Sequence, residues 1–371
     1  MQKKQVAIID IGSSKISALI GEKGINGTFV IKYNAEYEYD GFEINEFFDK
    51  EGFLSIIKKV GKEIKEMYHG ILTTVFVGVP GAFTESFVRD SQVSFSKKKK
   101  ITDEDLNALF DNAYSEKLVS SVLINRSAIL YELDDFRRVA NPVGEYSEIL
   151  KAKLSFIICT DYFTKDVEET LNSCGIRNVE FVSSPLAEAL YLVEPDVRDR
   201  YAVVLDVGYI TTTLSIIQGD GIVFMKSFDF GGGYITANLV ENFELSFDEA
   251  EKIKRKINLL SKSNYVDSMS VLECENGKYL SLQEVSKSIL ICLDTLCENI
   301  SNAFFEYKNN LPEYVSLMIT GGGISYLRGA KEHIAGRLNM VAQIIAPNVP
   351  LMEKPTMSSI LSLLNIALEQ N

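Results

Sequence analysis

Three apolar stretches of this chain each run directly into glycine or other small residues. They are residues 6–11 before Gly12, residues 201–207 before Gly208, and residues 315–320 before Gly321. A continuous apolar run bounded by glycine predicts a buried strand followed by a tight turn. The first two stretches also share Asp-x-Gly at the turn, so we interpret them as two copies of one duplicated unit.

The connections inside the first unit are too short to contain a helix. Residues 6–11, 15–21 and 28–33 therefore predict three strands that form a β-meander. The same pattern of strand, turn and strand recurs at residues 201–217 and 222–229.

The remaining periodicity predicts alternating helices and strands. Apolar residues at helical spacing predict helices at residues 53–67, 164–174, 184–191, 231–243, 281–309, 324–338 and 358–368, with a further helix start at Ser246. Short apolar runs predict strands at residues 74–79, 179–182 and 341–345. Residues 262–280 predict irregular strand and loop.

The character of the chain changes between residues 82 and 162. Residues 91–95 alternate like a strand and are followed by four lysines at residues 97–100. A lysine run suits an anionic lipid or nucleic acid. An acidic helix follows this run, however, so we interpret the lysines as a solvated loop.

A capping signal and two further strands complete this region. Thr102 and Asp105 have the spacing of a capping box and predict the start of a helix. Strands are predicted at residues 123–133 and 150–159, and Asn-Pro-Val-Gly at residues 141–144 predicts the turn between them.

Composition limits the class of protein. A chain of 371 residues with 46% apolar and 24% charged residues predicts a globular protein of two or more domains. The net charge of −13 argues against nucleic acid as a partner, because phosphate binding needs a basic face. No apolar run reaches about twenty residues, so no membrane-spanning helix is predicted. The first strand starts so near Met1 that we expect no signal peptide.

Few residues suit a transition metal or a nucleophilic triad. The five cysteines form no Cys-x-x-Cys pair, and their apolar surroundings predict reduced core residues of a cytoplasmic protein. His69 and His333 are the two histidines, which argues against a histidine-based metal site or triad.

The Asp-x-Gly turns place acidic side chains at strand ends. Asp10 and Asp206 would each present a carboxylate beside a bare backbone turn. A Mg-nucleotide needs this combination, because backbone N–H groups bind phosphate and a carboxylate holds the waters around the metal. An ordinary hairpin turn is the alternative for residues 10–13 alone, and the other two glycine turns favour the nucleotide interpretation.

Two Asp-x-Gly units followed by a late Gly-Gly-Gly turn resemble the ground plan of the actin-like ATPases. This superfamily includes chaperone ATPases, sugar kinases, MreB and FtsA, and its two lobes enclose a nucleotide. The stretch at Asp10 resembles the first phosphate loop, the stretch at Asp206 the second, and residues 321–323 the adenosine motif. The resemblance covers the whole chain and implies an α/β fold of two duplicated RNase H-like lobes.

The region at residues 82–162 distinguishes between branches of this superfamily. Residues 77–83 resemble the entry into the 1C subdomain of FtsA, which is of the SHS2 type. Residues 101–105 resemble the first helix of that subdomain, and residues 141–144 with 150–154 resemble a later segment. The matches keep their order and approximate spacing, so the chain is identified as FtsA-like. The pilus-assembly protein PilM shares this architecture and is the nearest competitor.

The resemblance implies two interrupted lobes. Residues 1–81 form the first lobe (1A), 82–162 the 1C subdomain, 163–200 the first lobe again, 201–229 the second lobe (2A), 230–305 its outer part (2B), 306–350 the second lobe again, and 351–371 a closing helix on the first lobe. That helix has no basic face and no aromatic anchor, so we expect it to pack on the protein and not on a membrane.

The resemblance also implies a site for ATP and Mg²⁺, with Asp10 and Asp206 as the magnesium residues. The implied nucleotide-binding residues are Asp10, Gly12, Ser13, Ser14, Lys15, Asp206, Gly208, Glu251, Lys254, Gly321, Gly322 and Gly323. In the family the first of these loops binds phosphate, and a Glu/Lys pair like Glu251 and Lys254 contacts ribose and adenine. A surface ion pair is the alternative for these two residues, because they stand three positions apart on one helix face.

Two departures from the family pattern weaken the implied site. Hydrolysing relatives have Asp-x-Gly-Gly-Gly-Thr at the second loop, whereas Tyr209 and Ile210 replace two of these glycines here. Relatives also place Glu or Gln near the start of the helix at residues 184–191, whereas this chain has Ser184 there and a Glu188 that we expect to point away. We therefore expect ATP to bind weakly or without efficient hydrolysis, and we assign no catalytic residue.

As an FtsA-like protein, the chain is expected to link the tubulin-like FtsZ to the division site, on the cytoplasmic side of the membrane. The FtsZ C-terminal tail peptide would bind the outer second lobe, near a basic patch formed by Lys252, Lys254, Arg255 and Lys256. Copies would form dimers or head-to-tail protofilaments through the 1C subdomain and the second lobe. Membrane association would come only through a partner or through a missing C-terminal segment.

Two other hypotheses stay open. One is a PilM-like, non-catalytic scaffold that binds the cytoplasmic peptide of a pilus membrane protein. The other is an active small-molecule kinase of the same superfold. The kinase is disfavoured because no acidic base and no substrate motif is visible, and because the FtsA-like region replaces the usual insertion.

Overall fold

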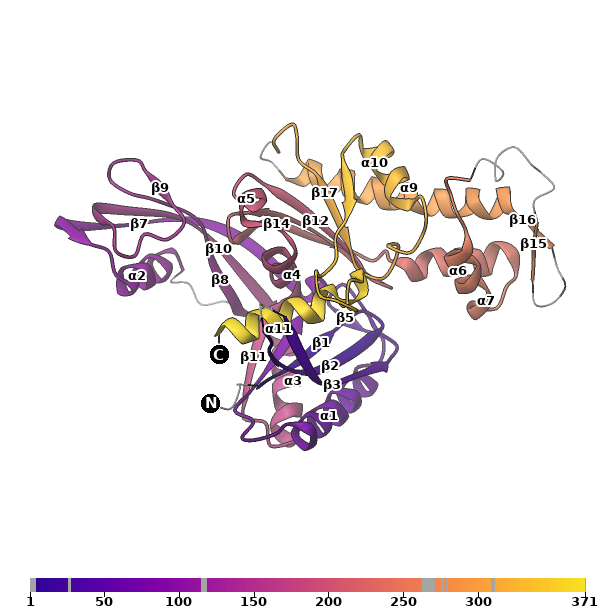
Figure 1. Cartoon of the computed structure of the whole chain (residues 1–371), viewed down its shortest axis with the longest axis horizontal. Coiled ribbons are helices and arrows are strands. Elements are labelled where there is room, and N and C mark those ends of the chain that lie inside the picture. Colours follow the sequence, from indigo (N-terminus) through magenta and orange to yellow (C-terminus); the bar gives the residue numbers. More distant parts are fainter. Residues whose placement is uncertain are drawn as a thin grey trace.

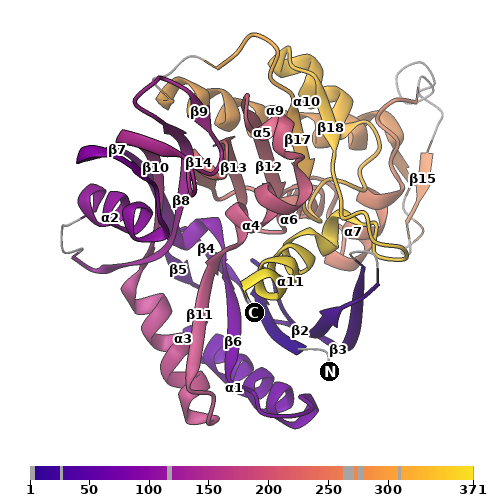
Figure 2. The ribbon, with the colours of Figure 1, turned by 60° about the vertical axis from the view of Figure 1, so that its left-hand side comes forward.

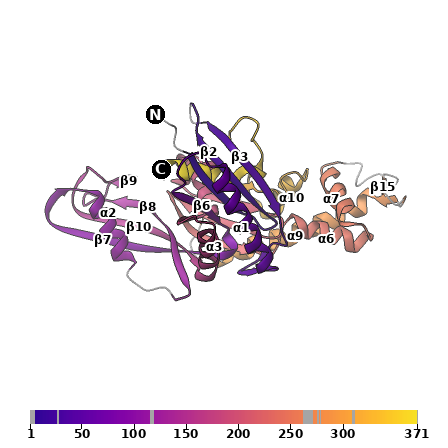
Figure 3. The same cartoon turned by 90° about the horizontal axis from the view of Figure 1, so that it is seen from below.

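The computed structural model describes residues 5–25, 28–114, 119–261, 271–274, 277, 279–307 and 311–370. Two lobes form its body (Figure 1). An arm, residues 84–160, and the outer part of the second lobe, which includes α6 (Gly232–Phe243) and α9 (Leu282–Glu306), extend from the body in opposite directions along the long axis (Figure 1). The view from below shows the same arrangement (Figure 3).

A five-stranded sheet forms the first lobe, in the order β11-β6-β1-β2-β3. Its strands are β1 (Gln5–Ile11), β2 (Lys15–Lys23), β3 (Phe29–Glu38), β6 (Thr74–Val79) and β11 (Asn178–Ser183). β1 pairs antiparallel with β2 and parallel with β6. The predicted meander is therefore confirmed, with a parallel pair added to it.

Alternate residues of β1 face two different helical layers. The helices of this lobe are α1 (Lys50–Met67), α3 (Asp161–Ser173), α4 (Ser184–Leu192) and α11 (Ser358–Gln370). Ala7 and Ile9 pack with α1 and α3, whereas Val6 and Ile8 pack with α4 and α11. Because both faces are buried, the strand is apolar without interruption from Val6 to Ile9. Figure 2 shows α11 lying along the first lobe, beside the second.

The second lobe repeats this sheet, in the order β14-β13-β12-β17-β18. Its strands are β12 (Ala202–Val207), β13 (Thr212–Gln218), β14 (Gly221–Phe228), β17 (Leu317–Thr320) and β18 (Ala342–Ile344). β12 pairs antiparallel with β13 and parallel with β17, so it has the position that β1 has in the first lobe. The shared strand order confirms the predicted duplication.

One face of the second sheet carries the outer helices, and the other face contacts the first lobe. The outer elements are α6 (Gly232–Phe243), α7 (Phe247–Lys256), α9 (Leu282–Glu306) and α10 (Ala330–Leu338), with the short strands β15 (Val271–Glu273) and β16 (Tyr279–Ser281). On the other face, Val204 and Ile217 pack with Leu186 of α4 and with Ile157 at the base of the arm. The two lobes and the arm therefore share a buried apolar cluster.

The arm is a four-stranded sheet covered by one helix. Its elements are β7 (Thr84–Lys100), α2 (Asp103–Ala113), β8 (Ser121–Glu132), β9 (Arg138–Val139) and β10 (Tyr146–Thr160), in the sheet order β7-β10-β8-β9. Leu109 of α2 packs on Leu154 and Phe156 of the sheet. The predicted capping box of Thr102 and Asp105 is present. The arm leaves the body after β6 and returns before β11, so it is inserted between two paired strands.

The lysine run belongs to a strand, which corrects its interpretation as a loop. β7 continues through Lys100, which pairs with Tyr146 at the start of the long strand β10. Acidic side chains balance the charge, with Lys99 at 3.0 Å from Asp105 and Lys98 at 3.8 Å from Asp134. Cross-strand pairing therefore outweighs the weak strand preference of lysine.

The helix predicted at residues 324–338 begins later, at Ala330. Gly329, which precedes it, has a φ of 94°, a left-handed conformation that interrupts a right-handed helix. Turns occupy the residues between the third glycine turn and this point. The strand expected at residues 262–280 is confirmed only in part, since residues 262–270 lie outside the described residues.

A buried arginine connects the end of α4 to the second lobe through hydrogen bonds and an ion pair. Arg198, in the short helix α5 (Pro195–Arg198), is 7% exposed. Its guanidinium donates hydrogen bonds to the carbonyls of Leu190 (3.1 Å), Val193 and Gly219 (3.2 Å), and it pairs with Asp220 at 2.7 Å. Gly219 and Asp220 form the turn between β13 and β14, so Arg198 joins segments of both lobes.

Candidate functional site

The parallel strands of both lobes end in the region between the lobes. Asp10 lies beside Gly78 of β6, and Asp206 lies beside Thr320 of β17. In open α/β sheets the carboxyl ends of parallel strands are the usual place for ligand sites. We name residues 10–15 the first loop, residues 206–211 the second loop, and residues 321–323 the third loop.

The three loops contact one another directly. The Ser13 hydroxyl of the first loop accepts hydrogen bonds from the amides of Ile210 (3.0 Å) and Thr211 (3.5 Å) in the second. The amide of Gly323 in the third loop donates to the carbonyl of Val207 at 2.7 Å. The structure therefore brings together the three stretches that the sequence singled out.

Three acidic side chains converge behind these loops. Burial raises the pKa of Asp10 to about 6, although a hydrogen bond from Ser359 (2.7 Å) opposes the rise. Burial, and then the charge of Asp10, raises the pKa of Asp206 to about 7. Burial and the charges of Asp206 and Asp10 raise the pKa of Glu188 well above its usual value. This acid cluster of Asp10, Glu188 and Asp206 holds its protons more tightly than exposed carboxylates do.

Glu188 faces the acid cluster, which corrects the prediction that it points away. It is 2% exposed, because α4 is packed between the two lobes and offers its side chain no route to solvent. One turn earlier, the Ser184 hydroxyl is buried and has no hydrogen-bond partner within the described structure. The four-residue spacing of Ser184 and Glu188 puts both on one helix face, and this was the signal in the sequence.

Two serines at the start of α11 also reach the strand ends, although the sequence motifs did not predict a role for them. Ser359 donates to the carboxylate of Asp10, while Thr320 of the second lobe donates to the Ser358 hydroxyl at 2.7 Å. Serine is favoured at helix starts because its hydroxyl bonds readily to nearby groups. A Ser-Ser pair at a predicted helix start was therefore the available signal.

The lysine of the first loop pairs with a neighbouring strand. The Nζ atom of Lys15 lies 2.7 Å from the carboxylate of Glu36 on β3. The Gly12 amide donates to the carbonyl of Lys15 (2.9 Å), and the Gly12 carbonyl accepts from the Tyr39 hydroxyl (2.7 Å). The contact of Lys15 with a phosphate oxygen therefore stays a prediction, and it would require the Glu36 ion pair to open.

The amides and carbonyls of the second loop are also used within the protein. The Gly208 amide donates to the carbonyl of Thr211 (2.9 Å), and the Gly208 carbonyl accepts from the Gly232 amide (3.0 Å). The carbonyl of Tyr209 accepts from the Gly233 amide at 2.7 Å. These bonds attach the second loop to the start of α6.

Glu251 and Lys254 form a buried pair between α6 and α7. Lys254 is 5% exposed and donates to the carbonyl of Gly232 (2.9 Å), the Thr236 hydroxyl (2.9 Å) and the carboxylate of Glu251 (2.7 Å). Burial alone would raise the pKa of Glu251, but hydrogen bonds from Lys254, Thr236 and Arg255 outweigh it and lower the pKa. The predicted basic patch is therefore wrong for Lys254, which is not on the surface.

Glycine is required in the third loop by its close approach to the second loop. A Cβ on Gly321 would lie 2.3 Å from Oδ1 of Asp206, and one on Gly323 would lie 2.2 Å from the carbonyl oxygen of Gly208. Gly321 also has a φ of 86°, which L side chains rarely adopt. A side chain at either position would push the two loops apart.

The loops, arranged in this way, do not fit a nucleoside triphosphate. The amides of Ile210 and Thr211 bind the Ser13 hydroxyl, and the cations of Lys15 and Lys254 are paired with protein groups. Within the described ranges, no group of three acidic, histidine or cysteine side chains has the arrangement of a metal site, and this includes the acid cluster. Entry of Mg-ATP would therefore require the loops to separate first.

Comparison with solved structures shows the fold. The chain matches the structure of a PilM-PilN type IV pilus biogenesis complex over 99% of both chains, with a TM-score of 0.63 and 16% identity. It also matches MreB5 of Spiroplasma citri bound to AMPPNP over 100% of this chain and 97% of that one, with a TM-score of 0.57 and 12% identity. These similarities confirm the predicted actin-like ATPase fold.

Comparison of sequences shows similarity to cell division protein FtsA. The family model of cell division protein FtsA matches residues 203–362. Cell division protein FtsA of Staphylococcus epidermidis is 22% identical over 98% of this chain and 78% of its own length. FtsA of Escherichia coli K12 is 23% identical over 68% of this chain and 60% of its own length. These matches show that the chain, with its duplicated lobes and inserted arm, is similar to the cell division proteins FtsA.

Proposed function

We propose that the protein is an FtsA-type, actin-like adaptor of bacterial cell division. The arm carries the proposal, because a four-stranded sheet with one helix is inserted between β6 and β11, in the region that resembles the 1C subdomain of FtsA. The relative that matches 98% of this chain is a cell division protein. The division into 1A, 1C, 2A and 2B that the resemblance implies is part of this proposal.

The site between the lobes is proposed to bind ATP weakly and without efficient hydrolysis. Mg²⁺, held near Asp10 and Asp206, would neutralise phosphate charge there. The proposal is supported by solved actin-like neighbours with bound nucleotide analogues, such as MreB5 with AMPPNP. The affinity is expected to be low, because the bonds of Ser13 to the second loop must open and each is worth about 1 kcal/mol.

Calorimetric titration with Mg-ATP tests this part. The parent protein is expected to bind with a dissociation constant on the order of 0.1–1 mM. Asp10→Ala should abolish the signal by removing a magnesium contact, and Gly322→Val should do so by filling the third loop, where a Cβ already lies 3.0 Å from Thr356. Asp90→Ala on the exposed arm is the matched control.

Two results would contradict the expectation. Binding that survives both Asp10→Ala and Gly322→Val would move the nucleotide away from these loops. Absence of binding in the parent would remove ATP from the proposed function and leave a nucleotide-free adaptor.

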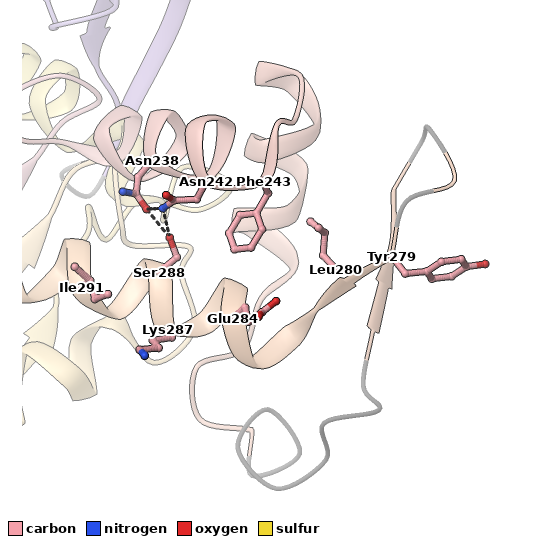
Figure 4. Close-up of a pocket in the computed structure, with 9 residues that line it drawn as sticks. All are labelled: Asn238, Asn242, Phe243, Tyr279, Leu280, Glu284, Lys287, Ser288 and Ile291. Atoms are coloured by element: carbon pink, nitrogen blue, oxygen red, sulfur yellow. Dashed lines mark hydrogen bonds between the residues drawn. The ribbon is translucent and has the colours of Figure 1, made fainter.

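The outer second lobe contains a groove that suits the FtsZ tail peptide. The groove has a volume of about 610 Å³ and lies between α6, β16 and α9 (Figure 4). Phe243, Leu280 and Ile291 line it with apolar surface, and Lys287 with Glu284 supplies charge. We propose that an FtsZ tail binds here, with apolar side chains in the groove and an acidic group near Lys287.

A hydrogen-bonded group fixes the two helices that form this groove. The Ser288 hydroxyl of α9 donates to the side chain of Asn238, and the amide of Asn242 donates to Ser288 at 3.1 Å. Figure 4 shows these three polar side chains between α6 and α9. A groove with fixed walls loses little conformational entropy when a peptide binds.

Replacement of Ile291 by glutamate is expected to weaken binding of an FtsZ tail peptide at least tenfold. Ile291 is 55% exposed, so the substitution should not disturb the fold, but it places a charge in the apolar part of the groove. Fluorescence anisotropy with a labelled tail peptide measures the effect. Ile71→Glu, at an exposed site on the first lobe, is the matched control. Equal affinity of both variants would place the peptide elsewhere.

Assembly and location complete the proposed function. Copies are proposed to form dimers or protofilaments through the arm and the second lobe. Sedimentation with and without ATP measures this assembly. Within the described residues, no helix has both the length and the apolar composition needed to cross a membrane. We propose that the protein acts at the division site, on the cytoplasmic side of the membrane.

A PilM-like scaffold is the second candidate function. It is favoured by the match to the PilM-PilN complex over nearly the whole of both chains. The peptide-binding measurement distinguishes the two functions when a PilN cytoplasmic peptide is titrated beside the FtsZ tail. Binding of the PilN peptide alone would replace the division function by a pilus function.

A further inference from the structure

The second loop crosses the space between the lobes. The Cδ1 atom of Ile210 lies 2.5 Å from where a Cβ on Gly41 would stand, so this methyl group fits against the first lobe only because residue 41 is glycine. The amides of Ile210 and Thr211 converge on the buried Ser13 hydroxyl. Two amides that point at one oxygen are the arrangement that binds a phosphate oxygen, and here the serine oxygen occupies it.

The ring of Tyr209 occupies the adjoining space over α6 and α7. Its Cε1 atom lies 2.8 Å from the Cβ position of Gly233, and its centroid lies 5.7 Å from Nζ of Lys254 and 6.4 Å from that of the Phe247 ring. Lys254 and Glu251 are the residues that the family resemblance assigns to adenine and ribose. The ring therefore covers the side chains that a nucleoside would contact.

We infer that the side chains of Tyr209 and Ile210 occupy the place of a nucleotide between the lobes. They would hold the two lobes closed when no nucleotide is bound. A second bond across the lobes, from the Ile44 amide to the carboxylate of Asp229 (2.9 Å), supports the same closed arrangement. The inference rests on the proposed function in one respect, since it takes the inter-lobe loops as the nucleotide site. Its consequence is that ATP must displace side chains of the protein itself.

Hydrogen exchange of the full chain, together with calorimetry, tests the inference. The parent is compared with a Tyr209→Gly/Ile210→Gly double variant and with a control, Phe136→Gly/Val143→Gly, at exposed positions of the arm. In the parent and the control, the second-loop amides should be protected without nucleotide, and Mg-ATP at a concentration well below its dissociation constant for the parent should change their exchange little. In the double variant, protection of the second-loop amides should fall about tenfold and should return when Mg-ATP is added. Mg-ATP should also bind the double variant about tenfold more tightly than the parent.

The gain in ATP affinity distinguishes two explanations for faster exchange in the double variant. Either the two side chains occupy the place of the nucleotide, or the glycines only destabilise the loop. A loop that is only destabilised would exchange faster without binding ATP more tightly, and that result would overturn the inference. It would also be overturned if the parent loop exchanged freely until Mg-ATP was added.

A milder variant and a parallel measurement keep the test decisive. If the double variant does not fold, Ser13→Ala removes the shared acceptor, and exchange should speed up at the amides of Ile210 and Thr211 while the rest of the chain is unchanged. Unchanged exchange at these amides would contradict the inference. Binding of the FtsZ tail peptide tests the adaptor function separately. Failure of the inference on Tyr209 and Ile210 is therefore distinguishable from failure of the proposed function.

Discussion

Asp206→Asn is expected to stabilise the protein by about 3 kcal/mol near pH 8, and by about 2 kcal/mol less near pH 5. Folding raises the pKa of Asp206 from 3.8 to about 7, through burial and then the charge of Asp10. A raised pKa stabilises the folded state fully below the unfolded pKa, and this contribution is lost as the pH rises through the folded pKa. Near pH 8 the parent therefore carries a desolvated, repelled carboxylate that asparagine removes.

Urea denaturation of the parent and the variant at both pH values, with EDTA present, measures this effect. Asp90→Asn, on the exposed strand β7, is the control and should change the unfolding free energy little at either pH. Asp206 and Glu188 are close enough to titrate as a pair, so the transition should be broad. A gain of the same size at both pH values would mean that the charge of Asp206 is not its cause.

Arg198→Met is expected to destabilise the protein by about 3–5 kcal/mol. The substitution keeps an apolar stem, but it leaves the buried carbonyls of Leu190, Val193 and Gly219 without their donor. The ion pair itself contributes little, since the side chain of Asp220 is 66% exposed. The midpoint of urea denaturation measures the loss.

Two further arginine variants show whether the buried hydrogen bonds are responsible. Arg198→Lys keeps the charge but not the planar set of donors, so its loss should be intermediate. Arg126→Met, at a side chain that is 45% exposed and pairs with Asp111, should cost less than about 0.5 kcal/mol. If Arg126→Met were as damaging as Arg198→Met, burial would not be the cause.

The sequence predicted those parts of the fold in which local pattern and tertiary burial agree. β1, β6 and β12 are buried on both faces, so their residues are mostly apolar, and Asp10 and Asp206 stand near the ends of β1 and β12. The capping box at Thr102 depends only on residues within one turn. The convergence of Asp10 and Asp206 follows from the strand–turn–strand repeat, because both residues stand at equivalent strand ends.

The remaining features depend on contacts between distant segments. The lysine run is a strand because β10 pairs with it, and Glu188 is buried because α4 lies between two lobes. The run of basic residues at 252–256 predicts a patch that includes Lys254, but this lysine is buried and bonds to Gly232 and Thr236 of the preceding helix. The position of Tyr209 over these residues also depends on how α6 and α7 pack.

The base of the arm contacts both lobes. The Ser155 hydroxyl of β10 donates to the carbonyl of Ile222 in β14 at 2.7 Å, and a Cβ on Gly219 would meet the carbonyl of Ile129 at 2.2 Å. Figure 2 shows the arm strands beside the edge of the second sheet. Rotation of one lobe against the other must therefore either break this contact or move the whole arm as a rigid body. A small change of angle between the lobes would then become a large displacement at the far end of the arm.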